Sequence, residues 1–244
     1  METKILESEF HALNKIATTY DDGPFDRAMR TYMMRTLEPF LLPGKALEMG
    51  CFNGAFSKLL AQKYDDLTVI DAVDEFLDNV RVINNNIKTA CTLFENYETN
   101  ERYDCIFIAH VLEHLADPVS VLAKARELLT PKGRIFLIVP NGYAASRQIA
   151  VKMGILPTND ALSLADIKHG HRRIYFLDTL TDEALQAKLK VIHTGGIFFK
   201  PLANFQFDRL IGTELISEAF MEGCYLLGKE HPNMSASIFA ICEL

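Results

Sequence analysis

The chain has 244 residues, of which 49% are hydrophobic and 23% are charged, and its formal net charge is −7. These values are typical of a globular protein with a sizeable core, and the sequence contains no repeat or low-complexity linker. The acidic balance argues against a nucleic-acid backbone as partner, because such affinity depends on clustered Lys and Arg, and no apolar run is long enough to cross a membrane.

The N-terminal residues and the cysteines indicate the compartment. Residues 1–20 carry charges of both signs and lack the apolar centre of a signal peptide, so we expect no secretory leader and a cytoplasmic protein. The five cysteines are odd in number, lie far apart and include no Cys-x-x-Cys pair. We therefore expect buried, reduced thiols rather than disulfides or a zinc site.

The first half of the chain predicts alternating helices and strands. Helical periodicity covers residues 3–18, and a second helix is predicted from Asp26 to Phe40, after the break YDDGPF. Asn53 is a candidate cap for a helix that begins beside Gly54. The other elements predicted here are the strands 46–49, 67–72, 90–95 and 103–111 and the helix 74–87.

The second half continues the alternation with one interruption. Asp117 is predicted to cap a helix that has Pro118 at its first position, and the strand 134–140 follows. Residues 141–177 lack a clear period, and an irregular connection of this length is usually functional or disordered. After it the sequence predicts a helix at 179–189, a strand at 190–199, a helical segment at 204–222 and a last strand at 236–244. Such alternation implies a parallel sheet with helices on both faces.

The stretch ALEMGCFNGAFSKLL, residues 46–60, has the form of a nucleotide-binding corner: strand, glycine turn, helix N-terminus. The spacing from Gly50 to Gly54 matches neither the dinucleotide pattern G-x-G-x-x-G nor the phosphate loop. Two acids accompany it, Glu48 before the turn and Asp71 at the end of the next strand. Asp71 suits the hydroxyls of a ribose, and Glu48 suits a ligand with a cationic end.

Four motifs fall in order at ordinary separations: LEMGCFNGAFSKLL, VIDAVDEFL, YDCIFIAHVLEHLADP and LLTPKGRIFLIVPN. Over residues 40–142 the chain resembles the class I S-adenosylmethionine-dependent methyltransferases, especially the small-molecule branch that includes ubiquinone and sugar methyltransferases. The resemblance implies an α/β fold, a Rossmann-like three-layer sandwich whose mostly parallel seven-stranded sheet has an antiparallel last strand. It also implies a helical N-terminal cover.

On this basis we expect one domain over residues 1–244 with S-adenosyl-L-methionine as cofactor and S-adenosyl-L-homocysteine as product. Its expected parts are a cover or lid (1–40), a cofactor-binding half (41–142), a substrate insert (143–177) and a C-terminal half (178–244) with an insertion at 200–234.

The resemblance assigns the cofactor residues. It places Glu48 and Gly50 at the methionine end, Asp71 on the ribose hydroxyls, and Phe94 and Glu95 at the border of the adenine. The remaining expected cofactor residues are Tyr20, Arg30, Cys51, Phe52, Ala72, Ala109, His110 and Val111. Phe52 departs from the family pattern acid-x-Gly-x-Gly-x-Gly, and we expect its ring near the cofactor.

The motif HVLEH, from His110 to His114, matches the H-x-x-E-H pattern of zinc proteases. It follows a buried strand directly and precedes the capped Asp-Pro helix, which is the methyltransferase context. We therefore expect no metal, and His114 is a candidate for catalysis or for orienting the substrate.

The motif DIKHGHRRIYF closes the irregular stretch. A histidine of near-neutral pKa can take a proton from an acceptor, which makes His169 and His171 candidate bases. Arg172 and Arg173 could hold a carboxylate or phosphate of the substrate, and a solvated basic turn is the alternative that stays open. Asn141 and Tyr143 complete the expected substrate-binding residues.

The expected function is methyl transfer to a hydroxyl oxygen of a small biosynthetic acceptor, with anionic and sugar-like molecules among the options. N-methylation, C-methylation and a non-catalytic cofactor-binding scaffold remain as alternatives. We expect a small-molecule partner, neither nucleic acid nor membrane, and leave a homodimer open.

Overall fold

The computed structural model describes residues 22–244, so the helix predicted at 3–18 and Tyr20 lie outside the described residues. Within this range the strands form one seven-stranded sheet in the order β3-β2-β1-β4-β5-β7-β6. The strands are β1 (Lys45–Met49), β2 (Asp66–Asp71), β3 (Lys88–Cys91), β4 (Tyr103–Ala109), β5 (Leu129–Pro140), β6 (Lys190–Phe199) and β7 (Ser235–Glu243). The first five pair in parallel, whereas β7 runs antiparallel to both β5 and β6. The expected mostly parallel sheet with an antiparallel last strand is confirmed.

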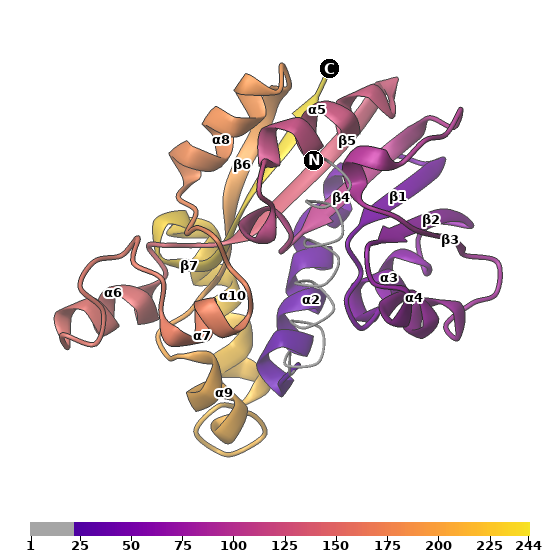
Figure 1. Cartoon of the computed structure of the whole chain (residues 1–244). Helices are drawn as coiled ribbons and strands as arrows, with labels where there is room; N and C mark the ends of the chain where they lie inside the picture. The colour runs from indigo at the N-terminus through magenta and orange to yellow at the C-terminus, as the bar shows by residue number, and fades with distance from the viewer. Residues whose placement is uncertain (1–21) are drawn as a thin grey trace.

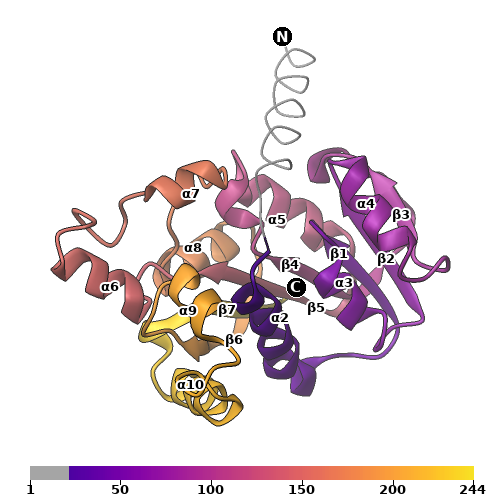
Figure 2. The same cartoon turned by 90° about the horizontal axis from the view of Figure 1, so that it is seen from below.

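Helices cover both faces of the sheet (Figures 1 and 2). The core on one face contains side chains of α2 (Pro24–Leu37), α3 (Ala55–Leu60), α4 (Asp74–Arg81), α9 (Asn204–Leu210) and α10 (Glu218–Glu230). The core on the other face contains side chains of α5 (Pro118–Glu127) and α8 (Leu177–Gln186). The result is the three-layer sandwich that the sequence predicts.

Strand β4 shows why the central strands read as continuous apolar runs. Cys105 and Phe107 belong to one core, whereas Ile106 and Ile108 belong to the other. Because successive side chains point to opposite faces, a strand covered on both sides has no polar alternation.

Several expectations from the sequence are wrong. The helix predicted at 74–87 ends at Arg81, and the strand predicted at 134–140 begins at Leu129. The third strand ends at Cys91, and residues Phe94–Asn96 form a 3-10 turn rather than strand. The helical segment 204–222 is two helices, because Gly212 takes a positive φ of 83° and Ser217 then caps α10 by accepting from the Phe220 N–H. Cys91 is exposed, although the sequence led us to expect buried thiols throughout.

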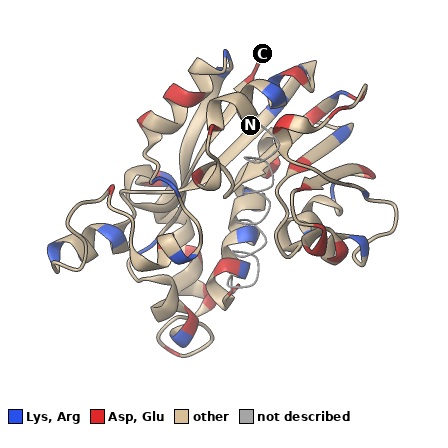
Figure 3. Cartoon of the chain, viewed as in Figure 1, with Lys and Arg blue, Asp and Glu red and all other residues tan. Residues whose placement is uncertain are grey.

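The insert between β5 and α8 is not irregular throughout. It contains α6 (Ala145–Lys152) and α7 (Leu164–Lys168), which lie at the end of the sheet where β5 finishes (Figure 1). Several apolar side chains of α6 and the residues after it are exposed, including Ile149 and Met153, so the segment has no clean amphipathic period. In Figure 3 the ribbon of α6 has blue segments at basic residues, and that of α4 has red segments at acidic residues.

The parallel pairing places the carboxyl ends of β1, β2, β4 and β5 at one edge of the sheet. Because ligands of open α/β sheets bind outside the carboxyl ends of the strands, this edge is where a site is expected. Among the described residues, no helix is both long and apolar enough to span a bilayer.

Candidate active site

The glycine corner after β1 depends on two left-handed residues. Gly50 has φ 87° and Gly54 has φ 76°, and Gly54 donates its N–H to the carbonyl of Cys51 (2.9 Å). A Cβ on Gly50 would lie 2.5 Å from Cγ2 of Val111 and 3.5 Å from Cζ of Phe94. Only glycine fits there, and the corner lies against Val111 after β4 and Phe94 after β3.

Phe52, in the middle of the corner, also lies in the left-handed region, with φ 47°. Its ring packs edge-on against Phe76 of α4, with centroids 5.2 Å apart. Asn53 beside it accepts from the Ala55 N–H (3.1 Å) and donates to Asp22 (2.9 Å). The prediction that Asn53 is the helix cap is wrong, because Gly54 occupies the N-cap position of α3 and Asn53 stands one residue before it.

Asp71 is buried at the end of β2 and is held by backbone donors. It accepts from the N–H groups of Cys51 and Val73, both at 2.9 Å. Burial raises the pKa of this carboxyl, and the N–H donors partly offset the rise. The Cys51 thiol also donates to Oδ2 of Asp71 (3.6 Å), so this carboxylate joins the end of β2 to the glycine corner.

Glu48 is 2% exposed and its Oε2 has no hydrogen-bond partner within the described part of the chain. Burial raises the pKa of Glu48 to about 8, and the nearby charge of Asp71 acts in the same direction. A buried carboxylate oxygen without a partner is costly. A cationic ligand group at the glycine corner would give this oxygen a partner and remove that cost. Glu48 therefore fits the ammonium end of S-adenosylmethionine.

An ion pair and a hydrogen bond, both to Asp22, connect helix α2 to this corner. Arg30 pairs with Asp22 (2.7 Å) and donates to the carbonyl of Asp26 (3.0 Å), while Asp22 also accepts from Asn53. Among the other expected cofactor residues, Ala72 is buried, Ala109 is partly buried and Glu95 is exposed.

His110 follows β4 with a left-handed backbone, φ 55°, and its Nε2 lies 2.9 Å from the hydroxyl of Ser237 on β7. Burial lowers the pKa of His110 to about 3, with further lowering from Arg30 and His171, so the imidazole is neutral at pH 7. Ser237 is a site residue that sequence reasoning missed, because it stands inside the apolar run of the last strand.

The two histidines of the HVLEH motif have different partners, Ser237 for His110 and His171 of the insert for His114. Residues Leu112–His114 form a 3-10 turn, and the ring of His114 meets that of His171 from the insert, with centroids 4.9 Å apart. The His169 ring is 6.2 Å from that of His171. The three candidate bases therefore gather in one cluster.

Burial governs the proton affinities in this cluster. It lowers the pKa of His114 to about 3 and raises that of the buried Glu113 to about 7. His169 is also lowered by burial. For His171, burial lowers the pKa, but the hydrogen bond that Nδ1 donates to Asp166 and the charge of Glu113 outweigh burial and raise the pKa above its ordinary value.

Ligand atoms of Glu113, His114 and His171 lie within 4.8 Å of one another, which is a donor set that a transition-metal ion can take. The expectation of a metal-free protein therefore stays a prediction.

Asp166 of α7 is a second residue that sequence reasoning missed. It accepts from the N–H and hydroxyl of Ser163, from Arg147 (3.1 Å) and from Nδ1 of His171 (3.2 Å). Burial raises the pKa of Asp166, but these hydrogen bonds outweigh it and hold the pKa well below its usual range. The Ser-x-x-Asp spacing of a capping box was the signal in the sequence.

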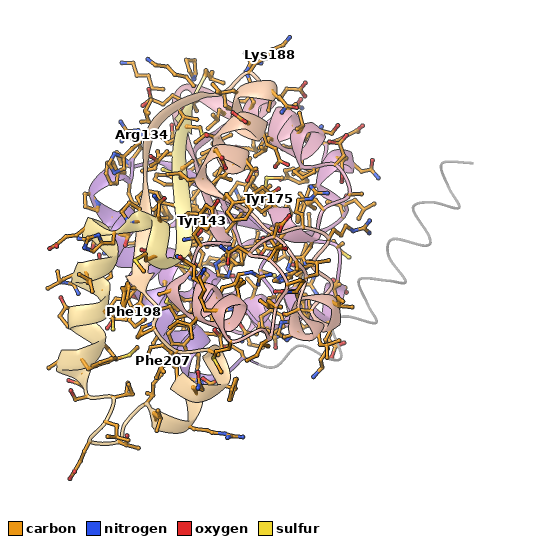
Figure 4. All side chains as sticks on the ribbon, turned by 90° about the vertical axis from the view of Figure 1, so that its left-hand side faces the viewer. Arg134, Tyr143, Tyr175, Lys188, Phe198 and Phe207 are labelled. Carbon is orange, nitrogen blue, oxygen red and sulfur yellow. The ribbon has the colours of Figure 1, made fainter. Side chains whose placement is uncertain are left out.

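The expected substrate residues lie at separate places on the rim. Arg172 is exposed, and Arg173 reaches the carbonyl of Ala116 (3.2 Å). Asn141 is buried and bonds the backbone at Pro232, Ser235 and Tyr143, which ties the end of β5 to β7. Tyr143 is exposed and packs on Phe176, in a groove beside α8 and β6 that also includes Thr181 and Thr194. Figure 4 shows Tyr143 and Tyr175 in this region.

Comparison with known proteins agrees with this geometry. A family model described as "Methyltransferase domain" matches residues 25–194, more than half of the chain. The ubiquinone biosynthesis O-methyltransferase of Hydrogenovibrio crunogenus is 27% identical over 210 residues, 80% of this chain and 85% of that protein. Nodulation protein S of Bradyrhizobium diazoefficiens is 29% identical over 113 residues, 45% of this chain, and the alignment spans 54% of that relative.

Among solved structures, the N-methyltransferase NodS from Bradyrhizobium japonicum WM9, in complex with S-adenosyl-L-homocysteine, has a TM-score of 0.60. The match covers 96% of this chain and 97% of that one at 17% identity, so it shows the shared fold. The family match, the sheet order and the glycine corner agree, and the chain belongs to the class I S-adenosylmethionine-dependent methyltransferases.

Proposed function

We propose that this enzyme transfers the methyl group of S-adenosylmethionine to a hydroxyl oxygen of a small biosynthetic acceptor, with His171 as the base. The acceptor lies under the insert 143–177, at the carboxyl edge of β4 and β5. The observation that carries the proposal is the hydrogen bond between Asp166 and Nδ1 of His171.

The residues of the cofactor-binding half suit S-adenosylmethionine, the methyl donor. Glu48 holds the ammonium end, Gly50 allows close approach of the backbone, and Asp71 holds the ribose hydroxyls. When bound, S-adenosylmethionine supplies an electrophilic methyl group on a sulfonium. The chain's main contribution is to hold the acceptor oxygen in line with that methyl group and to exclude water.

The Asp166–His171 pair supports transfer to oxygen rather than to an amine that is already neutral. A hydroxyl must lose its proton as the methyl group arrives, and an imidazole nitrogen can accept that proton. Asp166 bonds Nδ1 and so fixes the tautomer that leaves Nε2 free as the acceptor of a proton. His114, whose pKa is far lower, remains neutral and orients the acceptor.

The test is a pH–rate profile with the wild type and His171→Ala on a panel of matched alcohols, phenols and amines. We expect hydroxyl acceptors to react, and His171→Ala to lower kcat by about 10²- to 10⁴-fold, the range of general-base catalysis. Asp166→Asn is expected to lower kcat less and to shift the profile, while affinity for S-adenosylhomocysteine stays unchanged in both variants.

Three other outcomes are informative. Transfer to amines alone, with His171→Ala fully active, would replace the proposal with N-methylation. Transfer to carbon would do the same for C-methylation. Binding of S-adenosylhomocysteine without transfer to any acceptor of the panel would favour a non-catalytic cofactor-binding scaffold.

A further inference from the structure

We propose that the ammonium of Lys200 anchors an anionic group of the methyl acceptor, so that the substrate class is a carboxylate, phosphate or other small anion that also bears the reacting hydroxyl. This inference rests on the proposed function and assigns the acceptor's charged end to a residue outside the motifs of the sequence.

Lys200 follows β6 directly, and β6 runs in the same direction as β5 because both are antiparallel to β7. Its position is therefore at the carboxyl edge of the sheet, where the reaction takes place. The carbonyl of Lys200 accepts from the N–H of Ser146 (2.8 Å), the second residue of α6. This bond places Lys200 beneath the insert that covers the acceptor.

The surroundings of Lys200 are largely apolar. Its Nζ lies 5.6 Å from the ring centroid of Phe25, which stacks on Phe207 at 4.5 Å. Phe198 packs edge-on against both rings, and Figure 4 shows Phe198 near Phe207. An ammonium in such surroundings is poorly solvated, and burial lowers the pKa of Lys200 to about 8.

Among residues 22–244, no carboxylate forms an ion pair with Lys200. Its Nζ donates to Oδ1 of Asn204 (2.7 Å), which uses one of its three N–H donors. The other basic groups nearby are paired, Arg30 with Asp22 at 2.7 Å and Arg147 with Asp166 at 3.1 Å. Lys200 thus keeps a positive charge and unused N–H donors in surroundings where pairing with an anion is favourable.

Asn204 separates this charge from the nearest acid. While its Oδ1 accepts from Lys200, its Nδ2 donates to Oδ1 of Asp26 (3.0 Å). The amide fixes the position of the ammonium and occupies one oxygen of Asp26. The ligand that completes this arrangement is an anion.

Lys200 adds a positive charge to the region that follows β4. Lys200 and Arg30 are both near enough to His110 to lower its pKa, so the three groups share one region. Glu48 and Asp71 lie toward the cofactor end, and Asp166 is already bonded to Arg147 and His171. This division matches a cofactor with a cationic end and an acceptor with an anionic one.

The sequence predicted an anionic subsite at Arg172 and Arg173. Arg172 is exposed, and Arg173 bonds the carbonyl of Ala116 and lies 4.0 Å from Glu183. We therefore keep an anion as the expected ligand group and assign its binding to Lys200 instead of Arg172 and Arg173.

The test uses benzoate and benzamide, which share a shape and differ in charge, as probes of protein saturated with S-adenosylhomocysteine. Affinities are measured by ligand-observed NMR for the wild type, Lys200→Met and Lys200→Arg. Lys229→Met, which removes an exposed lysine of α10 that lies over the Tyr225 ring, is the matched control.

We expect the wild type and Lys229→Met to bind benzoate roughly tenfold more tightly than benzamide, Lys200→Met to bind both equally, and Lys200→Arg to keep part of the preference. Equal binding of both probes by the wild type, no measurable benzoate binding, or a preference that survives in Lys200→Met would overturn the proposal. Because S-adenosylhomocysteine is titrated first, loss of its binding would mark failure of the proposed function instead, and its retention in Lys200→Met shows that the variant is folded.

Discussion

Phe52 and His110 hold a backbone conformation that residues with a Cβ rarely adopt. Their φ angles are 47° and 55°, and they follow the neighbouring strands β1 and β4 at the carboxyl edge. A left-handed residue other than glycine costs about 1–2 kcal/mol and persists where its surroundings hold it, which is common at functional sites. Phe76 supports Phe52, and Ser237 supports His110.

Replacing Phe52 tests this balance. In Phe52→Gly the backbone strain disappears together with the ring contact to Phe76, which is worth about 0.5–1.5 kcal/mol, so the two effects nearly cancel. Phe52→Ala keeps the strain and loses the ring, and we expect it to be less stable than Phe52→Gly by about 1–2 kcal/mol. Chemical denaturation measures both differences, and an alanine variant as stable as the glycine variant would show that Phe52 is unstrained.

The site residues that local spacing could predict stand close to the ends of strands. Glu48, Gly50 and Asp71 stand at fixed offsets from strand ends, and the structure places all three at the glycine corner. Ser237 and Asp166 were missed because their partners, His110 and His171, are distant in sequence or separated by a turn that no pattern predicts.

At the scale of elements, the insert is held together by one arginine. Arg147 on α6 donates to the carbonyl of Asn159 (2.7 Å), to the carbonyl of Ala161 and to Asp166 (3.1 Å). These bonds join α6 to α7, and Asp166 in turn holds His171. The sequence could mark the segment only as a long stretch without a period, since its two helices are short and α6 is apolar on an exposed face.

Arg147→Ala is therefore expected to loosen the insert and leave the sheet intact. Hydrogen bonds to charged groups contribute about 1.5–3 kcal/mol, so loss of these bonds should speed amide exchange over residues 155–168 without changing exchange in β4 and β5. Hydrogen–deuterium exchange measures this. Lys152→Ala, which removes an exposed side chain from the same helix, is the control, and equal exchange in both variants would contradict the role of Arg147.

At the scale of the whole molecule, the sheet was predictable because its apolar strands and capped helices alternate at regular intervals. Asp117 caps α5 by accepting from the Ser120 N–H (3.1 Å), with Pro118 at the first helical position, as the local pattern indicates. The end of β3 was not predictable from composition. Residues 92–95 have the composition of a strand, but the pairing of β3 with β2 ends at Cys91. Sheet pairing, rather than composition, decides where a strand ends.

The buried charges of the site also set how the stability of the whole molecule depends on pH. Glu48 and Glu113 have pKa values of about 8 and about 7 in the folded protein, above their ordinary value of 4.5. The folded state therefore keeps protons that the unfolded state has lost, and the free energy of unfolding falls as the pH rises through this range. His110 and His114, with pKa values of about 3, have the opposite effect, but only below their ordinary value of 6.5.

Between pH 6.5 and pH 8 the carboxyl groups lower the free energy of unfolding without opposition from His110 and His114. The raised pKa of His171 lowers it further in this range. We expect the free energy of unfolding to fall across this window, with Glu48 alone contributing about 2 kcal/mol at about 1.4 kcal/mol per pH unit. Glu48→Gln replaces the protonated carboxyl with a neutral group of the same shape and should remove that part of the slope. Urea denaturation at a series of pH values measures it, with Glu127→Gln at an exposed site of α5 as control, and an unchanged slope in Glu48→Gln would show that Glu48 is ionised in the folded protein at neutral pH.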